Sequence, residues 1–304
     1  MEEVIIAVDA GGTKTKFCVM NHKLEIIHTH LEGCGSPAVL GVDAINNIHR
    51  GLLASMKFIN NKYKVVAISM GISGLGVIKD KTEHISKFEK EFNVPVIMEN
   101  DAVLALHSIV TDTYDEGILV LSGTGSAVLG IKNLETRLIG GWGHLLTEAG
   151  SSYSVVRDLI CDLIHSYEDK NEISSLGTEF MKRIEIEFVE QFKVFFYQNT
   201  KKEIASFSRF ISEMAEKGNK EAINLLIKAG EDLAVDVKNA YNALNLSSNA
   251  VIGFRGGFIR NLDIVKNSLV SKLTEFGLSL EIVEGYIDPI FGAYFMAKRY
   301  GVIW

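Results

Sequence analysis

The sequence has few cysteines, and none of them stands in a metal-binding arrangement. Cys18, Cys34 and Cys161 are scattered through 304 residues without any C-x-x-C pair. This pattern excludes the familiar zinc and iron–sulfur layouts, which need closely spaced ligands. Unpaired thiols are typical of proteins kept in a reducing compartment. We therefore expect a cytoplasmic protein.

Long apolar runs and basic stretches are also missing. No uncharged apolar run reaches the length of a membrane-spanning helix, and the chain starts with Met1-Glu2-Glu3, where a signal peptide would be basic. The formal net charge is −7, with no basic stripe. We expect neither a membrane nor a nucleic-acid partner. The 47% hydrophobic and 23% charged residues fit an ordinary globular protein of two domains.

Several common catalytic motifs do not occur. The chain contains no G-x-x-x-x-G-K-[ST] phosphate loop, and no G-x-G-x-x-G at a strand–helix turn with a suitable acidic residue. The motifs H-E-x-x-H and G-x-S-x-G are absent as well. A phosphate-binding function must therefore use a different loop.

Two glycine- and threonine-rich loops provide one. Residues 9–15 (DAGGTKT) and 121–126 (LSGTGS) each follow a short apolar run that predicts a buried strand. Glycines there allow backbone N–H groups and threonine hydroxyls to approach a phosphate. The expected nucleotide ligands are Gly11, Gly12, Thr13, Lys14, Thr15, Gly123, Thr124 and Gly125. Lys14 can equally be a solvated hairpin residue.

Both loops lie in the same predicted pattern of strand, loop, strand, turn and strand. The pattern covers residues 4–27 and again residues 117–139, which indicates a duplicated unit gripping a polyphosphate from both sides. After the first copy, helices over 42–60, 81–92 and 103–109 alternate with strands 64–70 and 94–98, which predicts a mostly parallel sheet. After the second copy, helices are expected over 152–168, 174–198, 203–217 and 219–244, then a strand at 250–254 and a helix from Pro289 to Tyr300.

Two aspartates stand at predicted strand ends. A carboxylate at Asp9, beside a bound polyphosphate, would be repelled unless a Mg²⁺ ion lay between them, so we interpret Asp9 as a magnesium ligand. Asp101 follows the strand 94–98, where ligands bind in open α/β sheets. It could accept the proton of a hydroxyl that attacks a γ-phosphate. The alternatives are a turn residue for Asp9 and a helix cap for Asn100 or Asp101.

A third group of residues follows the second repeat. The segment 140–151 (GGWGHLLTEAGS) could expose backbone groups to sugar hydroxyls, with Glu148 as a bidentate acceptor. Trp142 and His144 are more often packing residues than ligands. Gly256 and Gly257 follow a buried strand and would let a purine lie against the backbone, or they form a simple bend.

In this order, the motifs resemble those of the sugar kinases in the actin/hexokinase/heat-shock ATPase superfamily, most closely the N-acetylglucosamine kinase group of the BadF/BadG ATPase-like family. The resemblance runs essentially end to end. Residues 9–16 match the first phosphate motif, 121–126 the second, and 254–261 the adenosine motif. Asn100-Asp101 matches the catalytic site, and 140–151 the sugar-binding segment.

The resemblance implies an α/β fold of two ribonuclease-H-like (actin-like ATPase) domains around a cleft, the second with added helices. The domains would be 1–112 together with the helix 289–304, and 113–288. ATP and Mg²⁺ would bind between the loops, and closure would bring the 6-hydroxyl of an amino sugar to the γ-phosphate. The implied sugar ligands are Ser36, Gly74, Asn100, Asp101, Thr124, Gly141, Trp142, Gly143 and Glu148. A homodimer is expected.

Two departures concern the sugar. Relatives usually carry Asn where this chain has Ser36, and Asp-Glu or Asp-Asp where it has Glu148-Ala149. The shorter Ser36 could admit N-acetylmuramic acid, with its 3-O-lactyl group, beside N-acetylglucosamine. Alternatives are a broad-specificity hexokinase or glucosamine kinase, and a sugar-sensing or partner-activating actin-like ATPase. The scattered cysteines disfavour the iron–sulfur activators. Sugar-sensing transcription factors of the ROK type carry an N-terminal DNA-binding segment, whereas we expect the first strand here to start at residue 4.

Overall fold

The computed structural model describes residues 1–303 and divides into two compact units. Unit 1 comprises Met1–Gly117, Ile131–Thr136 and the chain from Ile282 onward, and unit 2 comprises Ile118–Gly130 and Arg137–Glu281. The sequence placed the boundary at residue 112, in the loop after a helix. The grouping into units changes within the strand Glu116–Ser122, and residues 131–136 group with unit 1, where the Arg299 side chain donates to the Asn133 carbonyl oxygen.

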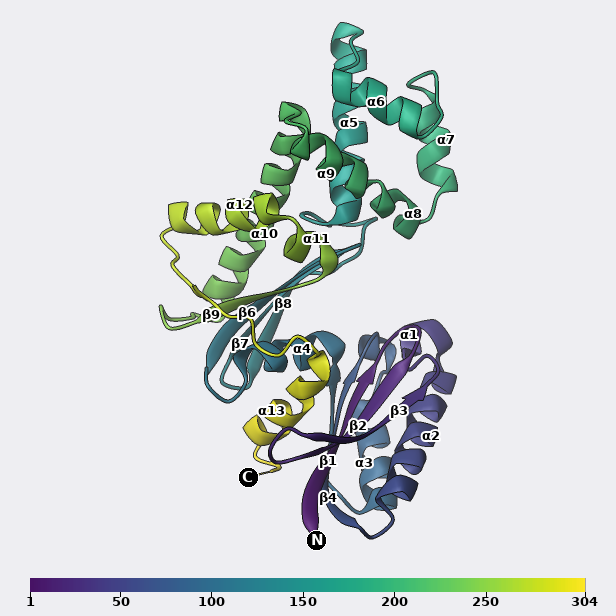
Figure 1. Ribbon diagram of the computed structural model, residues 1–304, viewed down its shortest axis with the longest axis vertical. Coiled ribbons are helices and arrows are strands. Elements are labelled where there is room, and N and C mark those ends of the chain that lie inside the picture. The colour runs from purple at the N-terminus through teal and green to yellow at the C-terminus, as the bar shows by residue number, and fades with distance from the viewer. Residues whose placement is uncertain (304) are drawn as a thin grey trace. The chain divides into compact units, whose positions relative to one another are not determined.

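Unit 1 is built on a five-stranded sheet in the order β3-β2-β1-β4-β5 (Figure 1). Its strands are β1 (Glu2–Ala10), β2 (Thr15–Asn21), β3 (Ile26–Glu32), β4 (Tyr63–Ile72) and β5 (Val96–Asn100). β1 pairs antiparallel with β2 and parallel with β4, which in turn pairs parallel with β5. Residues Val4–Val8 are buried without alternation, because helices cover both faces of this central strand.

The helices of unit 1 lie on the two faces of this sheet. They are α1 (Pro37–Leu40), α2 (Val42–Ile59), η1 (Leu75–Val77), α3 (Lys81–Phe92), α4 (Asp101–Val110), η2 (Pro289–Phe291) and α13 (Gly292–Arg299). α2 and α3 cover one face, and α4 and α13 the other (Figure 1). α13 packs closely on α4, because a Cβ at Gly292 would lie 1.9 Å from the Leu104 carbonyl oxygen.

Unit 2 repeats the strand order of unit 1. Its sheet runs β10-β9-β6-β7-β8, with β6 (Glu116–Ser122), β7 (Ser126–Lys132), β8 (Glu135–Gly140), β9 (Val251–Arg255) and β10 (Glu281–Ile282). Read from the other edge, this order is β8-β7-β6-β9-β10, so β6, β7 and β8 take the places that β1, β2 and β3 take in unit 1. The predicted duplication of a ribonuclease-H-like unit is confirmed.

Unit 2 carries more helices than unit 1. They are α5 (Ser152–Lys170), α6 (Ser175–Arg183), α7 (Gln191–Gln198), α8 (Lys201–Ser206), α9 (Ser208–Glu216), α10 (Lys220–Ala243), α11 (Gly257–Asn261) and α12 (Asp263–Glu275). α6, α8 and α9 pack on α5, and α9 also packs on α10. With α7 they form a helical part of unit 2 (Figure 1). We call α6–α9 the helical insert.

Two helices of the insert that the sequence predicts as continuous are each divided into two in the structure. The helix expected over 174–198 is interrupted after Arg183, where Glu185 has a φ of 58° and the Gln191 side chain accepts from the N–H groups of Glu187 and Phe188. The helix expected over 203–217 breaks at Phe207, whose ring packs on Phe180. Apolar spacing alone did not reveal these breaks. The helix expected over 219–244 is continuous, and Asn219 caps it, since its side chain accepts from the Ala222 N–H.

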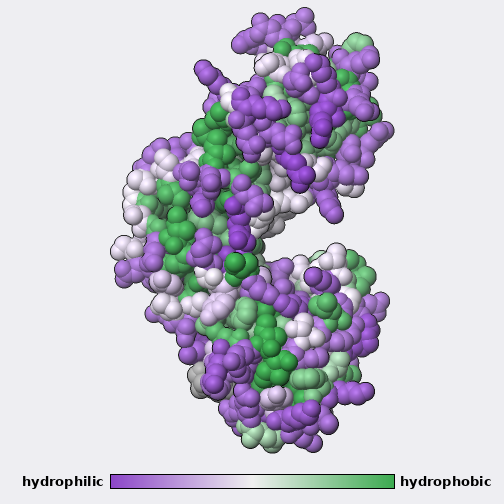
Figure 2. All heavy atoms as spheres, viewed as in Figure 1, coloured by the Kyte–Doolittle hydropathy of each residue, from purple (hydrophilic) through white to green (hydrophobic). Residues whose placement is uncertain are grey.

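One face of the surface is mainly hydrophilic (Figure 2). On the face drawn in Figure 2, polar residues cover most of each unit, and hydrophobic residues show in separate patches. None of the helices within residues 1–303 combines the length and the apolar character that crossing a membrane requires.

Candidate active site

In unit 1, the carboxyl ends of three parallel strands bring predicted site residues together. The strand register aligns Asp9 of β1 with Gly71 of β4, and Gly71 with Glu99 of β5. The residues that follow β4 and β5 therefore stand beside Asp9. Among them, Ser73 donates its backbone N–H to the Ala10 carbonyl oxygen at 2.8 Å. This edge of the sheet is where an open α/β fold binds ligands.

Asp101 is the first residue of α4 and is half-buried. Asn100 caps the helix, because its side-chain oxygen accepts from the Ala102 N–H at 2.9 Å. Burial raises the pKa of the Asp101 carboxyl, while a hydrogen bond from the Ser73 hydroxyl acts against that rise. A carboxylate held in this way is a better proton acceptor at neutral pH than a free one. The sequence did not single out Ser73, although its place after β4 was the available signal.

Asp9 lies in a cluster of carboxylates. Burial, together with the charges of Asp101 and Asp288, raises its pKa to about 6, against the opposing charges of Lys16 and Lys14. Asp288 caps η2 and pairs with Lys16. Neither Lys16 nor Asp288 was predicted as a site residue. The pair could not be seen in the sequence, because Asp288 comes from the far end of the chain.

The chemistry of this cluster fits a hard cation. Carboxylate oxygens are the protein ligands that Mg²⁺ prefers, and it commonly takes one or two of them, with phosphates and water completing the shell. Within residues 1–303, no group of three or more Asp, Glu, His or Cys side chains could hold a metal by itself. Asp9 can therefore contribute one ligand of a site that a substrate completes.

The first glycine-rich loop is a tight hairpin between β1 and β2. The Gly11 N–H donates to the Lys14 carbonyl oxygen at 3.0 Å, and Gly12, Thr13 and Lys14 are exposed. Thr15 differs from its expected role. It is fully buried and its hydroxyl donates to the Gly33 carbonyl oxygen at 2.9 Å, so it fixes the neighbouring loop in place.

Two predicted sugar ligands of unit 1 touch each other. Ser36 is only 2% exposed, at the start of α1. A Cβ at Gly74 would lie 2.9 Å from the Ser36 hydroxyl oxygen and 2.5 Å from the Ala38 Cβ. Gly74 also has a φ of 70°, so a glycine is required there on both counts. Bulk at residue 36 would therefore press on the Gly74 loop.

In unit 2, the second glycine-rich loop meets the predicted adenosine motif. Gly256 has a φ of 99°, and a Cβ on it would lie 2.3 Å from the Ser122 carbonyl oxygen. A Cβ on Gly123 would lie 3.8 Å from the Gly257 backbone nitrogen, with no closer neighbour. The two motifs, far apart in sequence, thus touch through bare backbone.

A cavity of about 710 Å³ opens beside this contact. Its lining includes Gly123, Thr124 and Gly257 of the two motifs, and Phe207 and Phe258 as aromatic walls. The other lining residues are Ser152, Arg183, Ser206, Ser208, Arg209, Phe210, Ser212, Asn261 and Leu262. None of these described residues is acidic, and two are exposed arginines, although the chain carries a net charge of −7. The helical insert supplies both arginines, which no sequence motif had indicated.

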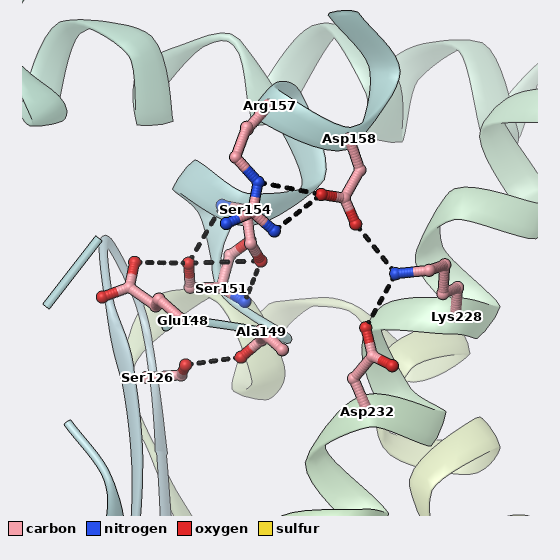
Figure 3. Close-up of polar contacts among 9 residues, drawn as sticks. All are labelled: Ser126, Glu148, Ala149, Ser151, Ser154, Arg157, Asp158, Lys228 and Asp232. Atoms are coloured by element: carbon pink, nitrogen blue, oxygen red, sulfur yellow. Dashed lines mark hydrogen bonds and ion pairs between the residues drawn. The ribbon is translucent and has the colours of Figure 1, made fainter. Parts of the chain in front are cut away.

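Glu148 lies beneath the second loop. Its side chain is 3% exposed, and its two oxygens accept from the Ser151 hydroxyl at 3.0 Å and from Lys201 Nζ at 2.7 Å. Figure 3 shows the first of these contacts, with Ser151 lying between Glu148 and Ser154. Because each carboxylate oxygen can accept two hydrogen bonds, some accepting capacity is left for a sugar. That role stays a prediction.

Within the predicted sugar segment, residues 141, 142 and 145–147 are exposed to solvent. Trp142 is 70% exposed, and Gly141 and Gly143 on either side of it have positive φ. His144 instead stacks edge-on against the Tyr153 ring, with centroids 4.9 Å apart, as a packing residue would. Trp142 is therefore free to meet a ligand, whereas His144 is used within unit 2.

Two sheets of the same strand order, each with a glycine-rich loop after its first strand, define the ribonuclease-H-like fold of the actin-like ATPases. The glucokinase of the ROK family from Streptomyces griseus, solved with glucose and AMPPNP, has a similar fold. The TM-score is 0.55 at 15% identity, over 97% of this chain and 98% of that one.

Residues 6–297 match the BadF/BadG/BcrA/BcrD ATPase family, and the chain belongs to this family. The N-acetylmuramic acid/N-acetylglucosamine kinase of Clostridium acetobutylicum is 26% identical, covering 97% of this chain and 98% of that relative. The N-acetyl-D-glucosamine kinase of Dictyostelium discoideum is 25% identical over the same shares of the two chains.

Proposed function

We propose that this protein is an ATP- and Mg²⁺-dependent kinase that phosphorylates the 6-hydroxyl of N-acetylglucosamine and of N-acetylmuramic acid. The names of the two relatives above support an amino sugar as the acceptor. The family is one of ATPases, and the S. griseus glucokinase holds an ATP analogue.

One observation carries the nucleotide part of this proposal. In unit 2, Gly123 and Thr124 of the second glycine-rich loop and Gly257 of the predicted adenosine motif line a single cavity, whose described lining includes two arginines and no acidic residue. Its volume of about 710 Å³ lies within the range of small-molecule sites. Aromatic walls, bare glycine backbone and positive charge together fit a nucleoside with attached phosphates.

Asp101 supplies the base. As the acceptor's 6-hydroxyl oxygen forms a bond to the γ-phosphorus, the bond from that phosphorus to the β–γ bridging oxygen breaks and ADP leaves. The hydroxyl proton passes to the Asp101 carboxylate. The Ser73 hydroxyl holds this carboxylate in place, and Asn100 fixes the start of α4. Asp9 would hold Mg²⁺, which neutralises phosphate charge when it is bound.

Ser36 and Gly74 bear on acceptor choice. Both lie after strands of unit 1, near the edge that carries Asp101. Serine at position 36 is smaller than the asparagine that relatives usually carry, so it fills less of this part of unit 1. A pocket rejects an added group such as the lactyl ether only if side chains occupy that space.

An acceptor screen tests the proposal. The purified protein, ATP and Mg²⁺ are incubated with N-acetylglucosamine, N-acetylmuramic acid, glucosamine, N-acetylmannosamine or glucose, and ADP release is followed. NMR of the product locates the phosphate. We expect ADP release to require a 2-acetamido sugar and the phosphate to lie on O6. Preference for glucose or glucosamine would instead support the broad-specificity alternative.

The same assay separates the other classes. ADP release at an undiminished rate without sugar would indicate a partner-activating ATPase, and sugar binding without ADP release would indicate a sensor. Light scattering on the same sample tests the expected homodimer.

A further inference from the structure

Lys201 lies at the second glycine-rich loop although it belongs to the helical insert. It is the first residue of α8, whose start is fixed by a capping box. In that box, the Thr200 N–H donates to Glu203 at 2.7 Å, and the Glu203 N–H donates to the Thr200 hydroxyl oxygen at 3.3 Å. The backbone position of Lys201 is thereby defined.

Its ammonium group reaches the bare backbone of Gly125. A Cβ built on Gly125 would lie 2.7 Å from Lys201 Nζ and 2.9 Å from Glu148 Oε2. The same ammonium pairs with Glu148 at 2.7 Å and lies 6.0 Å from the centre of the Tyr153 ring. Three contacts therefore direct one cation to this loop.

The two partners differ in exposure. Glu148 is 3% exposed and Lys201 is 28% exposed. A lysine has three donor hydrogens, and Glu148 accepts one of them. The ammonium therefore keeps an open side and free donors beside a loop whose backbone N–H groups provide no full charge of their own.

We propose that Lys201 binds the terminal phosphates of the nucleotide on the Gly123–Gly125 loop, and that Glu148 holds it in position. This inference rests on the proposed function. It makes Glu148 a positioning residue for a cation, which differs from the predicted contact with the sugar. It also gives the helical insert a direct part in recognising the number of phosphates.

The test compares nucleotides of increasing charge. Dissociation constants for AMP, ADP and a non-hydrolysable ATP analogue are measured by calorimetry on wild type, Lys201→Met and Lys201→Arg. Loss of a charge-assisted hydrogen bond is expected to weaken the ATP analogue roughly 10- to 100-fold. ADP should weaken less and AMP should be unchanged. Lys201→Arg should recover part of the loss.

Lys202 is the matched control. It is the next residue of α8, carries the same charge and is exposed. Lys202→Met should bind all three nucleotides as wild type does. An equal loss in Lys202→Met would show a general charge effect and overturn the assignment.

Lys201→Met leaves the buried Glu148 carboxylate without its cation, which could unfold the loop. The double variant Glu148→Gln/Lys201→Met removes both charges and should show the same graded loss. An equal loss for all three nucleotides, or a change confined to the sugar KM, would overturn the proposal. If the wild-type protein binds no nucleotide, the proposed function itself fails. If the wild type binds nucleotides but the Lys201 variants show no graded loss, only the assignment of Lys201 fails.

Discussion

The two units share a strand order, but the charged side chains around their glycine-rich loops are mainly of opposite sign. In unit 1, the loop after β1 stands with the carboxylates Asp9, Asp101 and Asp288. In unit 2, the loop after β6 stands with Lys201 and with a cavity lined by Arg183 and Arg209. Lys16 pairs with Asp288 in unit 1 and Glu148 pairs with Lys201 in unit 2, but acids predominate at the first loop and cations at the second.

The difference in charge suits the two loops to different chemical tasks. Carboxylates suit the binding of a cation and the removal of a proton, whereas cations and bare glycine backbone suit polyphosphate. Asp9 belongs to the repeat itself, but several of the other charges come from segments outside it. Asp288 follows the last strand of unit 2 in sequence, and the arginines and Lys201 belong to the helical insert. The repeat supplies the frame, and the added segments supply much of the charge.

The largest effect should follow loss of the base in unit 1. Asp101→Asn keeps the shape of the side chain but removes the proton acceptor, so we expect kcat to fall roughly 10²- to 10⁴-fold. Glu99→Gln is the matched control, because Glu99 lies two residues earlier and pairs with Lys81. Steady-state kinetics on both folded variants decide the matter. Near-normal kcat in Asp101→Asn would remove the assignment.

The next effect concerns the bare backbone of unit 2. A Cβ at Gly123 would meet no atom closer than the Gly257 backbone nitrogen at 3.8 Å, so we expect Gly123→Val to leave the empty protein folded. Phosphate can then no longer approach, and the KM for ATP should rise roughly 10- to 100-fold. Thermal unfolding checks the fold. A Gly123→Val protein with the wild-type KM for ATP would show that the loop is only a hairpin turn.

Acid should act through unit 1. Because the pKa of Asp9 is raised to about 6, most Asp9 is protonated at pH 5, and the apparent KM for Mg²⁺ should be roughly 10-fold higher there than at pH 8. Asp288→Asn removes a charge that raises this pKa, so the midpoint should move to lower pH. The exposed Asp263→Asn is the control. Comparing variants cancels the titration of ATP itself, and an unmoved midpoint would contradict the role of Asp9.

The same shift has a consequence for stability. In the metal-free protein, the folded state binds more protons than the unfolded state between pH 3.8 and about 6. The contribution of Asp9 therefore makes the fold more stable as the pH falls through this window. Urea unfolding of wild type and Asp288→Asn at several pH values should show that the free energy of unfolding depends less on pH in the variant.

The smallest effect concerns acceptor choice. Ser36→Asn should lower kcat/KM for N-acetylmuramic acid several-fold more than for N-acetylglucosamine, because the added amide fills space that the lactyl group needs. Ser36→Ala, which adds no bulk, should affect both sugars alike. Since Ser36 touches the Gly74 loop, equal losses on both sugars in Ser36→Asn would point to loop displacement instead of selectivity.

Local patterns predicted the frame well. Each phosphate loop follows an apolar strand, and the helices 42–60 and 81–92 were placed nearly to the residue, because their apolar stripes and caps are local signals. The insert was less predictable. Its breaks at Arg183 and Phe207 depend on Gln191 accepting from backbone and on aromatic packing around Phe180, which are tertiary contacts.

The placement of Asp9 and Asp101 at one edge of the sheet was predictable, because each lies next to a motif at a strand end, while their roles stay predictions. It was not predictable where the residue comes from elsewhere. Lys201 and Asp288 reach their partners over 53 and 272 residues of chain, respectively. Ser73 could have been found by asking which side chain ends the strand between β1 and β5. Lys201 and Asp288 could not be predicted mainly because their partners are distant in sequence, and less because of their residue types.

The composition of unit 1 affects how the protein is made. Its sheet is encoded by the first third of the chain, but α13, which packs on α4 at Gly292, is encoded near the end. Arg299 of the same helix donates to the carbonyl oxygens of Thr111 and Tyr114. During synthesis, the first unit must therefore wait with one face of its sheet incompletely covered while all of unit 2 leaves the ribosome. The unit that begins first is finished last.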